Sequence, residues 1–254
     1  MFGAVVVGQH NDRTRRGGST PRWRRCRLLA ERPREAGHRL DALWDYITSH
    51  QSQLVFDSYQ HVSAVMQSVV IATVIGVVIG LLTYRNDIAS SLATSISSAV
   101  LTVPSFALLG LLIPLVGLGV IPSITALVLY SLLPIIRNTI VGMNNIEPAL
   151  IDAARGIGMG RLITLVRVEL PLVWPAILAG MRLSTQMAMG VLAIAAYVKG
   201  PGLGNLIFAG LARVGSPTAV PMALSGTLLI VILALVLDAL YVLLGRLTTS
   251  KGIR

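Results

Sequence analysis

Charged residues are scarce in this chain, at 13% of 254 positions, and aromatic residues make up only 5%. Hydrophobic residues reach 54%, which is more apolar surface than one soluble core of this length needs. A single cysteine, Cys26, excludes an intrachain disulfide, and the four scattered histidines do not suggest a metal site. No Gly-Lys-Ser or Gly-Lys-Thr occurs. The composition predicts a membrane protein without redox, metal or nucleotide chemistry of its own.

Five apolar runs are long enough to cross the membrane as helices, because about 20 apolar residues span about 30 Å of hydrocarbon. They are residues 62–84, 92–115, 120–141, 172–198 and 220–244. The runs are continuous and lack the alternation of lipid-facing strands. The sequence therefore predicts an all-α, polytopic membrane protein with a transmembrane domain over residues 62–245.

Basic residues are concentrated at the N-terminus, where ten of the 21 lysines and arginines precede Leu40. Segment 1–39 has no helical periodicity, which predicts a disordered, arginine-rich extension. Without this segment the chain is only slightly basic, so we expect no nucleic-acid partner. Residues 40–61 have the pattern of a short amphipathic helix at the membrane interface, with Trp44 and Tyr46 in the headgroup layer.

Loop arginines predict the orientation in the membrane. Arg155, Arg161 and Arg167 lie between the third and fourth runs, so we expect this connection and the tail 246–254 to be cytoplasmic. Five spans then place the arginine-rich N-terminus outside, which the positive-inside rule disfavours. We therefore hypothesise that translation begins near Leu40 and that the extension is an artefact of start-site choice.

The longest polar interruption between the runs is the loop 144–171. Asn144 and Glu147 have the spacing of a capping box, Pro148 suits a first helical turn, and Gly158 suits a left-handed helix end. These signals predict a helix over residues 147–157, joined by glycines to a second short helix. Small alanines and the charges of Asp152 and Arg155 give the first helix the character of a docking element.

The spacing of Asp152-Ala153-Ala154, Gly158 and Val168-x-Leu170-Pro171 resembles the EAA-type loop of ABC importer permeases, with Asp152 in place of the usual glutamate. The resemblance implies a type I permease fold whose loop forms a coupling helix inserted into a separate ATP-binding subunit. Coupling roles fall on Glu147, Asp152, Ala153, Ala154, Arg155 and Gly158. On this reading ATP is bound by the partner, and the chain is not an enzyme and holds no cofactor. The alternative is an unrelated cytoplasmic helix that contains two alanines by chance.

Three further stretches resemble the permeases of betaine, carnitine and choline (osmoprotectant) importers. They are LTVPSFALLGLLIP (101–114), ALVLYSLLPIIRNT (126–139) and IAAYVKGPGLG (194–204). The resemblance covers about residues 40–245 and implies solutes such as glycine betaine, choline, carnitine or proline betaine. It also implies an extracytoplasmic substrate-binding protein, a second permease copy or paralogue, and the bacterial inner membrane. Lys199 and Pro201 depart from the family pattern.

A few residues inside the apolar runs are candidates for the transport pathway. Pro104 and Pro114, with Pro122 and Pro134, interrupt the second and third runs, which fits either broken pathway helices or plain kinks. Arg182 and Asp238 carry charge into the membrane; we expect them to face the bundle interior as a pair, or else to snorkel. Because no aromatic cluster is visible in the runs, we expect solute selectivity to reside in the receptor.

Other functions stay open at this point. A methionine or polar amino-acid permease would share the coupling loop and the five spans. An ion-coupled secondary transporter or channel would need intramembrane acids, for which Asp238 is thin support. A membrane scaffold would require that the loop around Asp152 bind no ATPase.

Overall fold

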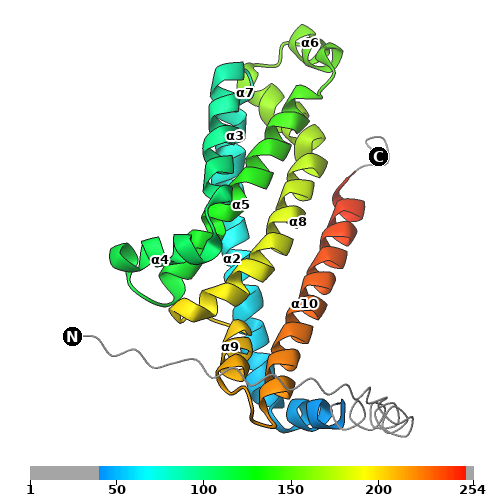
Figure 1. Cartoon of the computed structure of the whole chain (residues 1–254). Helices are drawn as coiled ribbons and strands as arrows, with labels where there is room; N and C mark the ends of the chain where they lie inside the picture. Colours follow the sequence, from blue (N-terminus) through cyan, green and yellow to red (C-terminus); the bar gives the residue numbers. More distant parts are fainter. Residues whose placement is uncertain (1–39, 250–254) are drawn as a thin grey trace, which may run out of the picture. The chain divides into compact units, whose positions relative to one another are not determined.

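The computed structural model describes residues 40–249, and residues 42–249 belong to one compact unit (Figure 1). The expectations for 1–39 and for the end of the tail, 250–254, fall outside the described residues. The main helices are α2 (Gln51–Thr83), α3 (Asp87–Thr102), α4 (Ser105–Val116), α5 (Val120–Asn144), α6 (Pro148–Gly156), α7 (Arg161–Thr164), α8 (Leu170–Ala195), α9 (Gly204–Ala212) and α10 (Ala219–Thr248).

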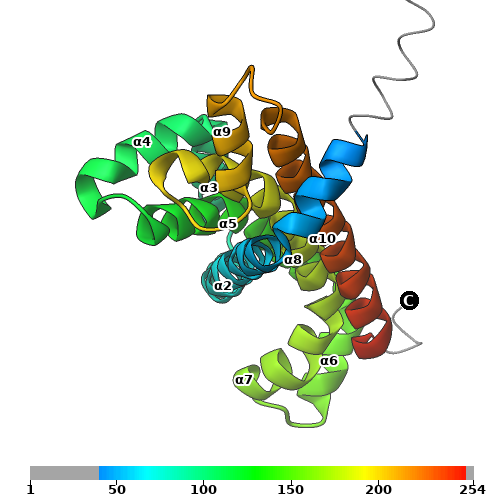
Figure 2. The same cartoon turned by 90° about the horizontal axis from the view of Figure 1, so that it is seen from below.

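Helices α2, α5 and α8 form the centre of the bundle, with α3 and α4 on one side and α10 on the other (Figure 2). Close packing at the centre depends on glycine. A Cβ on Gly80 would lie 2.7 Å from Thr139 Cγ2, and one on Gly180 would lie 3.0 Å from the Pro134 carbonyl oxygen. Small residues of this kind let helix backbones approach within a membrane, where apolar side chains gain little by leaving lipid.

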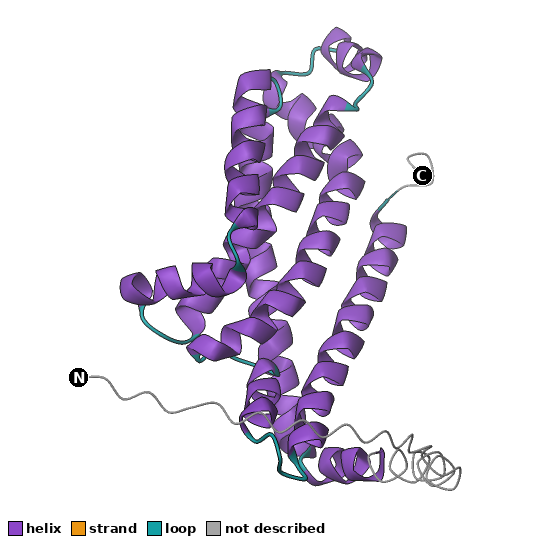
Figure 3. Cartoon of the chain, viewed as in Figure 1, coloured by secondary structure: helices purple, strands orange, loops and turns teal. Residues whose placement is uncertain are grey.

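Within 40–249 there is no strand, which confirms the all-α prediction (Figure 3). Four helices are long and apolar enough to span a membrane: α2, α5, the continuous run Arg161–Val198 that contains α8, and α10. They match four of the five predicted spans. The second short helix expected after the glycines is therefore the beginning of the α8 span.

The second predicted span is wrong as a single helix. It is divided into α3 and α4, which are bent by 96°. The break falls at Val103, whose extended backbone (ψ 127°) is the conformation that a residue before proline favours. Tyr130 donates a hydrogen bond to the Val103 carbonyl oxygen at 2.6 Å, so the carbonyl freed at the break is satisfied. Pro104 thus separates two helices.

The other three prolines are accommodated within helices. Pro114 lies inside α4, and Pro122 and Pro134 lie inside α5. Of the two readings, a broken helix is therefore found at Pro104, whereas the other three prolines leave the reading of plain kinks.

The segment 40–61 is not one interfacial helix. Residues 40–49 are helical, and a bend at His50 precedes α2, which begins at Gln51. Trp44 is exposed, whereas Tyr46 is buried and stacks on the His50 ring, so it is not a headgroup anchor. His61 is fully buried and donates from Nε2 to the Met189 carbonyl oxygen at 3.2 Å, joining α2 to α8.

Candidate functional site

Helix α6 lies beyond the ends of α5 and α8, on the same side of the bundle as the end of α10 (Figure 1). Its span, Pro148–Gly156, confirms the predicted helix to within one residue at each end. The predicted capping box is wrong, because Asn144 is the last residue of α5 and Glu147 occupies the N-cap position without a side-chain hydrogen bond. Pro148 begins the helix instead, where its missing N–H costs nothing.

The end of α6 is a Schellman motif built on glycine. Gly158 has a φ of 84°, as predicted from its position in the sequence. Its N–H donates to the Arg155 carbonyl oxygen at 2.9 Å, and the N–H of Met159 donates to that of Ala154 at 3.1 Å. The chain is thereby turned sharply back toward α7.

The exposed face of α6 carries most of the residues that we predicted to couple transport to an ATPase. Asp152 and Arg155 form an ion pair at 3.6 Å with their side chains 74% and 59% exposed, and Ala153 and Glu147 are also exposed. Ala154 is buried, so it packs α6 onto the rest of the chain. One face of α6 is therefore free to meet a partner and the other is held in place.

Glu169, a buried carboxylate that the sequence analysis did not identify, lines a small cavity together with Ile151 and Arg155 of α6. The Glu169 side chain is 2% exposed and accepts a hydrogen bond from the Tyr84 hydroxyl at 3.1 Å. Arg85 lies 3.6 Å from its other oxygen and donates from Nε to the Tyr84 hydroxyl.

This cluster of Tyr84, Arg85 and Glu169 joins the end of α2 to the beginning of α8. Glu169 ends a π-helical turn, Leu165–Glu169, inserted between α7 and α8. The extra residue of a π-turn shifts the direction of the side chains that follow, and such turns are frequent at functional sites. Arg155 and Arg161 line a small cavity beside Glu169, so the cluster is in contact with the loop that carries α6.

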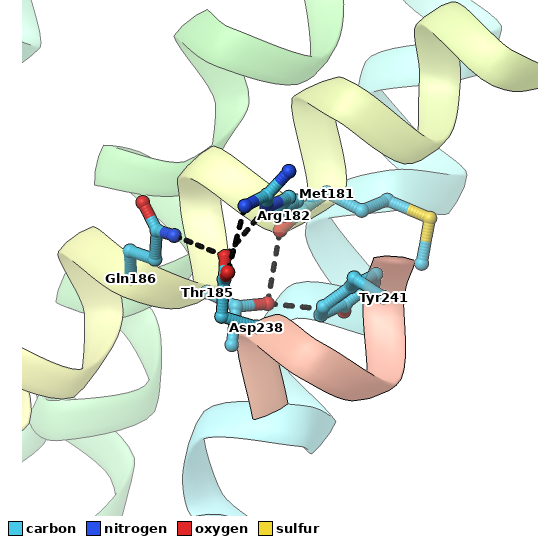
Figure 4. Close-up of polar contacts among 6 residues, drawn as sticks. All are labelled: Met181, Arg182, Thr185, Gln186, Asp238 and Tyr241. Carbon is cyan, nitrogen blue, oxygen red and sulfur yellow. Dashed lines mark hydrogen bonds and ion pairs between the residues drawn. The ribbon is translucent and has the colours of Figure 1, made fainter. Parts of the chain in front are cut away.

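The second candidate site lies within the membrane span. Arg182 of α8 and Asp238 of α10 form a bidentate ion pair, with Nη2 to Oδ2 at 2.7 Å and Nε donating to Oδ1 (Figure 4). Gln186 also donates to Oδ1 of Asp238. One turn away, the Thr185 hydroxyl donates to the Met181 carbonyl oxygen at 2.9 Å and forms a hydrogen bond with the Tyr241 hydroxyl at 3.0 Å. The geometry fits the paired arrangement rather than two snorkelling side chains.

Arg182 and Gln186, which both donate hydrogen bonds to Asp238, line an open cavity of about 620 Å³ between α8 and α10. Its wall includes Pro175, Arg182 and Gln186 from α8 and Tyr241 and Gly245 from α10. Residues separated by three or four positions share one face of a helix, so one stripe of each helix forms the wall. The Arg182 and Asp238 side chains are 44% and 23% exposed, so the pair lies at the surface of the chain, beside the cavity, rather than in the packed centre.

The structure brings the predicted residues together in two places. The coupling residues gather on and next to α6, and Arg182 pairs with Asp238 at the edge of the cavity between α8 and α10. Pro104 and Pro114 contribute to neither place, because they lie at the α3–α4 bend and inside α4.

Contrary to expectation, three aromatic rings do cluster. Tyr197 lies 5.1 Å from Phe106 and 6.2 Å from Phe208, between ring centroids. These rings come from residues far apart in the sequence, so no local pattern could have revealed the contact.

Comparisons with known proteins agree with this geometry. The family model described as "Binding-protein-dependent transport system inner membrane component" matches residues 72–250. The osmoprotectant import permease protein OsmW of Salmonella typhimurium is 40% identical over 214 residues, covering 82% of this chain and 98% of the relative. The choline transport system permease protein OpuBB of Bacillus subtilis is 32% identical, covering 82% and 94%.

Solved structures show the fold. An inward-facing structure of the MetNI methionine ABC transporter matches with a TM-score of 0.67 at 22% identity, over 78% of this chain and 96% of that one. The family model and the curated relatives confirm the resemblance to ABC importer permeases that the sequence showed. The chain belongs to the family of binding-protein-dependent transport system inner membrane components, as a multi-pass inner-membrane permease related to those of osmoprotectant importers.

Proposed function

We propose that this permease carries small zwitterionic or quaternary ammonium osmoprotectants, such as glycine betaine, choline, carnitine or proline betaine, into the cell. The observation that supports this most strongly is the 40% identity to an osmoprotectant permease along 98% of the relative's length. Relatives named for choline and for carnitine support the same class of solute. The likeness to the methionine transporter is one of fold, so it carries no argument about the solute.

The energy for transport comes from a separate ATP-binding subunit that docks on α6. Exposed Asp152, Ala153 and Arg155 form the contact surface, with Glu147 at its edge, and Gly158 fixes the angle at which α6 leaves the membrane domain. Because Ala154 and the cluster of Tyr84, Arg85 and Glu169 hold the loop against α2 and α8, a displacement of α6 moves both spans. ATP is bound by this partner and not by the chain itself.

The pathway lies along the cavity between α8 and α10, where a second permease copy or a paralogue completes it. Charge within a membrane span is stable where it faces protein or water, and lipid provides neither. The half-exposed Arg182 and its partner Asp238 therefore favour a protein-covered or water-filled face on this side. An extracytoplasmic binding protein delivers the solute to the opposite end of the bundle from α6.

Uptake of labelled glycine betaine, in cells stripped of other osmolyte importers and supplied with the partner subunits, tests this function. We expect wild type to take up the solute. Asp152→Ala should take it up at least tenfold more slowly at an equal amount of permease in the membrane, because the exposed carboxylate contacts the ATPase. Asp87→Ala is the matched control: this exposed aspartate belongs to α3 and not to α6, so uptake is expected to stay within twofold. Uptake that survives Asp152→Ala refutes the coupling role, and a wild type that takes up none of the four solutes refutes the solute class.

A further inference from the structure

The pair of Arg182 and Asp238 lies near the middle of the membrane. Trp174, near the beginning of α8, donates to Thr248 at the end of α10 at 2.9 Å, so these two helix ends are side by side. At a rise of 1.5 Å per residue, Arg182 lies about 18 Å along α8 from Leu170, and Asp238 lies about 15 Å along α10 from Thr248. Half of a hydrocarbon layer is about 15 Å thick. The two charges therefore meet at the depth where transporters commonly hold their solutes.

The cavity at this depth is suited to a small molecule. Its volume of about 620 Å³ is within the usual range of ligand sites, about 300–1,000 Å³. Its wall is mainly apolar, and its polar side chains include Arg182 and Gln186, which both bond to Asp238. Asp238 is not part of the wall, but its side chain is 23% exposed and is bonded to Arg182, which is 44% exposed. A molecule in the cavity that binds Arg182 therefore lies next to Asp238.

We propose that Arg182 and Asp238 form a transient binding site for the zwitterionic solute, whose carboxylate binds Arg182 and whose ammonium group lies against Asp238. This proposal rests on the function proposed above and names the residues that act on the solute within the membrane. No covalent bond is made or broken. The ion pair between Arg182 and Asp238 is replaced by two ion pairs, one between Arg182 and the solute carboxylate and one between Asp238 and the solute ammonium group.

The exchange conserves charge pairing, which is why a zwitterion fits better than a simple ion. The guanidinium fork now holds the Asp238 carboxylate through two hydrogen bonds, and it can hold a solute carboxylate in the same way. Asp238, released from Arg182, faces the cationic end of the solute beside the ring of Tyr241, which also lines the cavity. A solute of one charge would leave either the arginine or the aspartate unpaired. When the solute departs, the pair closes again and no uncompensated charge remains.

Two double variants separate the effect of the charges on transport from the effect of side-chain packing. Arg182→Gln with Asp238→Asn removes both charges and keeps polar side chains, whereas Arg182→Lys with Asp238→Glu keeps both charges and alters the fork geometry. The measurement is glycine betaine transported per ATP hydrolysed, in proteoliposomes that contain the full chain and its partners. Relative to wild type, we expect at least tenfold less transport in the neutral double variant. The charged double variant should transport at least fivefold more than the neutral one.

The single variant Arg182→Gln is expected to lower the ratio of glycine betaine to choline uptake at least fivefold, because choline has no carboxylate.

A second test does not touch the ion pair and covers the case in which the pair variants fail to assemble. A Cβ on Gly245 meets no atom within 4 Å, and Gly245 lines the cavity, so Gly245→Leu fills it from the α10 side. Gly190 on α8 has the same free space but lies outside the cavity wall, which makes Gly190→Leu the matched control. We expect at least tenfold lower transport in the first variant and less than twofold change in the second.

Each outcome distinguishes the two proposals. Neutral and charged variants that transport equally, or Gly245→Leu transport equal to that of Gly190→Leu, would overturn the binding site and leave the permease function standing. A wild type that transports neither glycine betaine nor choline would overturn the proposed function and this site with it.

Discussion

Gly158 and Glu169 each fix one end of the connection between α6 and α8: Gly158 ends α6 with a φ of 84°, and Glu169 accepts a hydrogen bond from Tyr84 at the end of α2. Gly158 was predictable because the residues that it ends, Pro148–Gly156, are its neighbours in the chain and a left-handed helix end strongly favours glycine. Glu169 was not predictable, because its partner Tyr84 is 85 positions away. Hydropathy and local spacing carry no information about a contact at that distance.

The Schellman turn gives a prediction at this scale. Gly158→Ala places a side chain at a φ of 84° and should destabilise the α6 loop by about 1 kcal/mol. Gly156→Ala, two residues earlier at a helical position with free space, should instead stabilise α6 by about 0.5–1 kcal/mol. Hydrogen exchange of the amides in residues 151–156 measures both effects: faster exchange in the first variant and slower in the second. Equal exchange in the two variants would contradict the role assigned to Gly158.

At the scale of elements, four membrane helices follow from apolar length alone, whereas their breaks and ends depend on finer causes. The bend at Pro104 falls inside a continuous apolar run, so hydropathy merged α3 and α4 into one span. The predicted first span began at residue 62, whereas α2 begins at Gln51. Residues 51–61 include polar side chains, so a hydropathy window leaves them out of the span. One of these, His61, is nevertheless buried and bonded to the Met189 carbonyl oxygen.

The joint between α2 and α8 gives the prediction at this scale. Tyr84→Phe leaves the buried Glu169 carboxylate without its hydroxyl donor, which should cost about 1–3 kcal/mol. Tyr59→Phe removes a hydroxyl from an exposed tyrosine on the same helix and should leave stability unchanged within about 0.5 kcal/mol. Thermal unfolding of the two variants in the same lipid nanodiscs measures the difference. A Tyr84→Phe midpoint equal to that of Tyr59→Phe would show that Glu169 does not depend on this contact.

For the whole molecule, the two candidate sites occupy different levels of one bundle. Helix α8 connects them directly, since its beginning follows Glu169 and its middle carries Arg182. A movement of α6 that is transmitted to α8 changes the position of Arg182 relative to Asp238 on α10. The same rigid element can therefore link the ATPase contact to the opening and closing of the ion pair. The family pattern in the sequence predicted the coupling loop, but the cavity emerges only when α8 and α10 are packed together.

The decisive measurement for the proposed function is accumulation of labelled glycine betaine in proteoliposomes that contain this permease, its ATPase and its binding protein. The proposed function requires accumulation that depends on ATP and the binding protein and persists when the proton gradient is collapsed. Accumulation that follows an imposed proton gradient without ATP would contradict it and return the chain to the class of ion-coupled transporters.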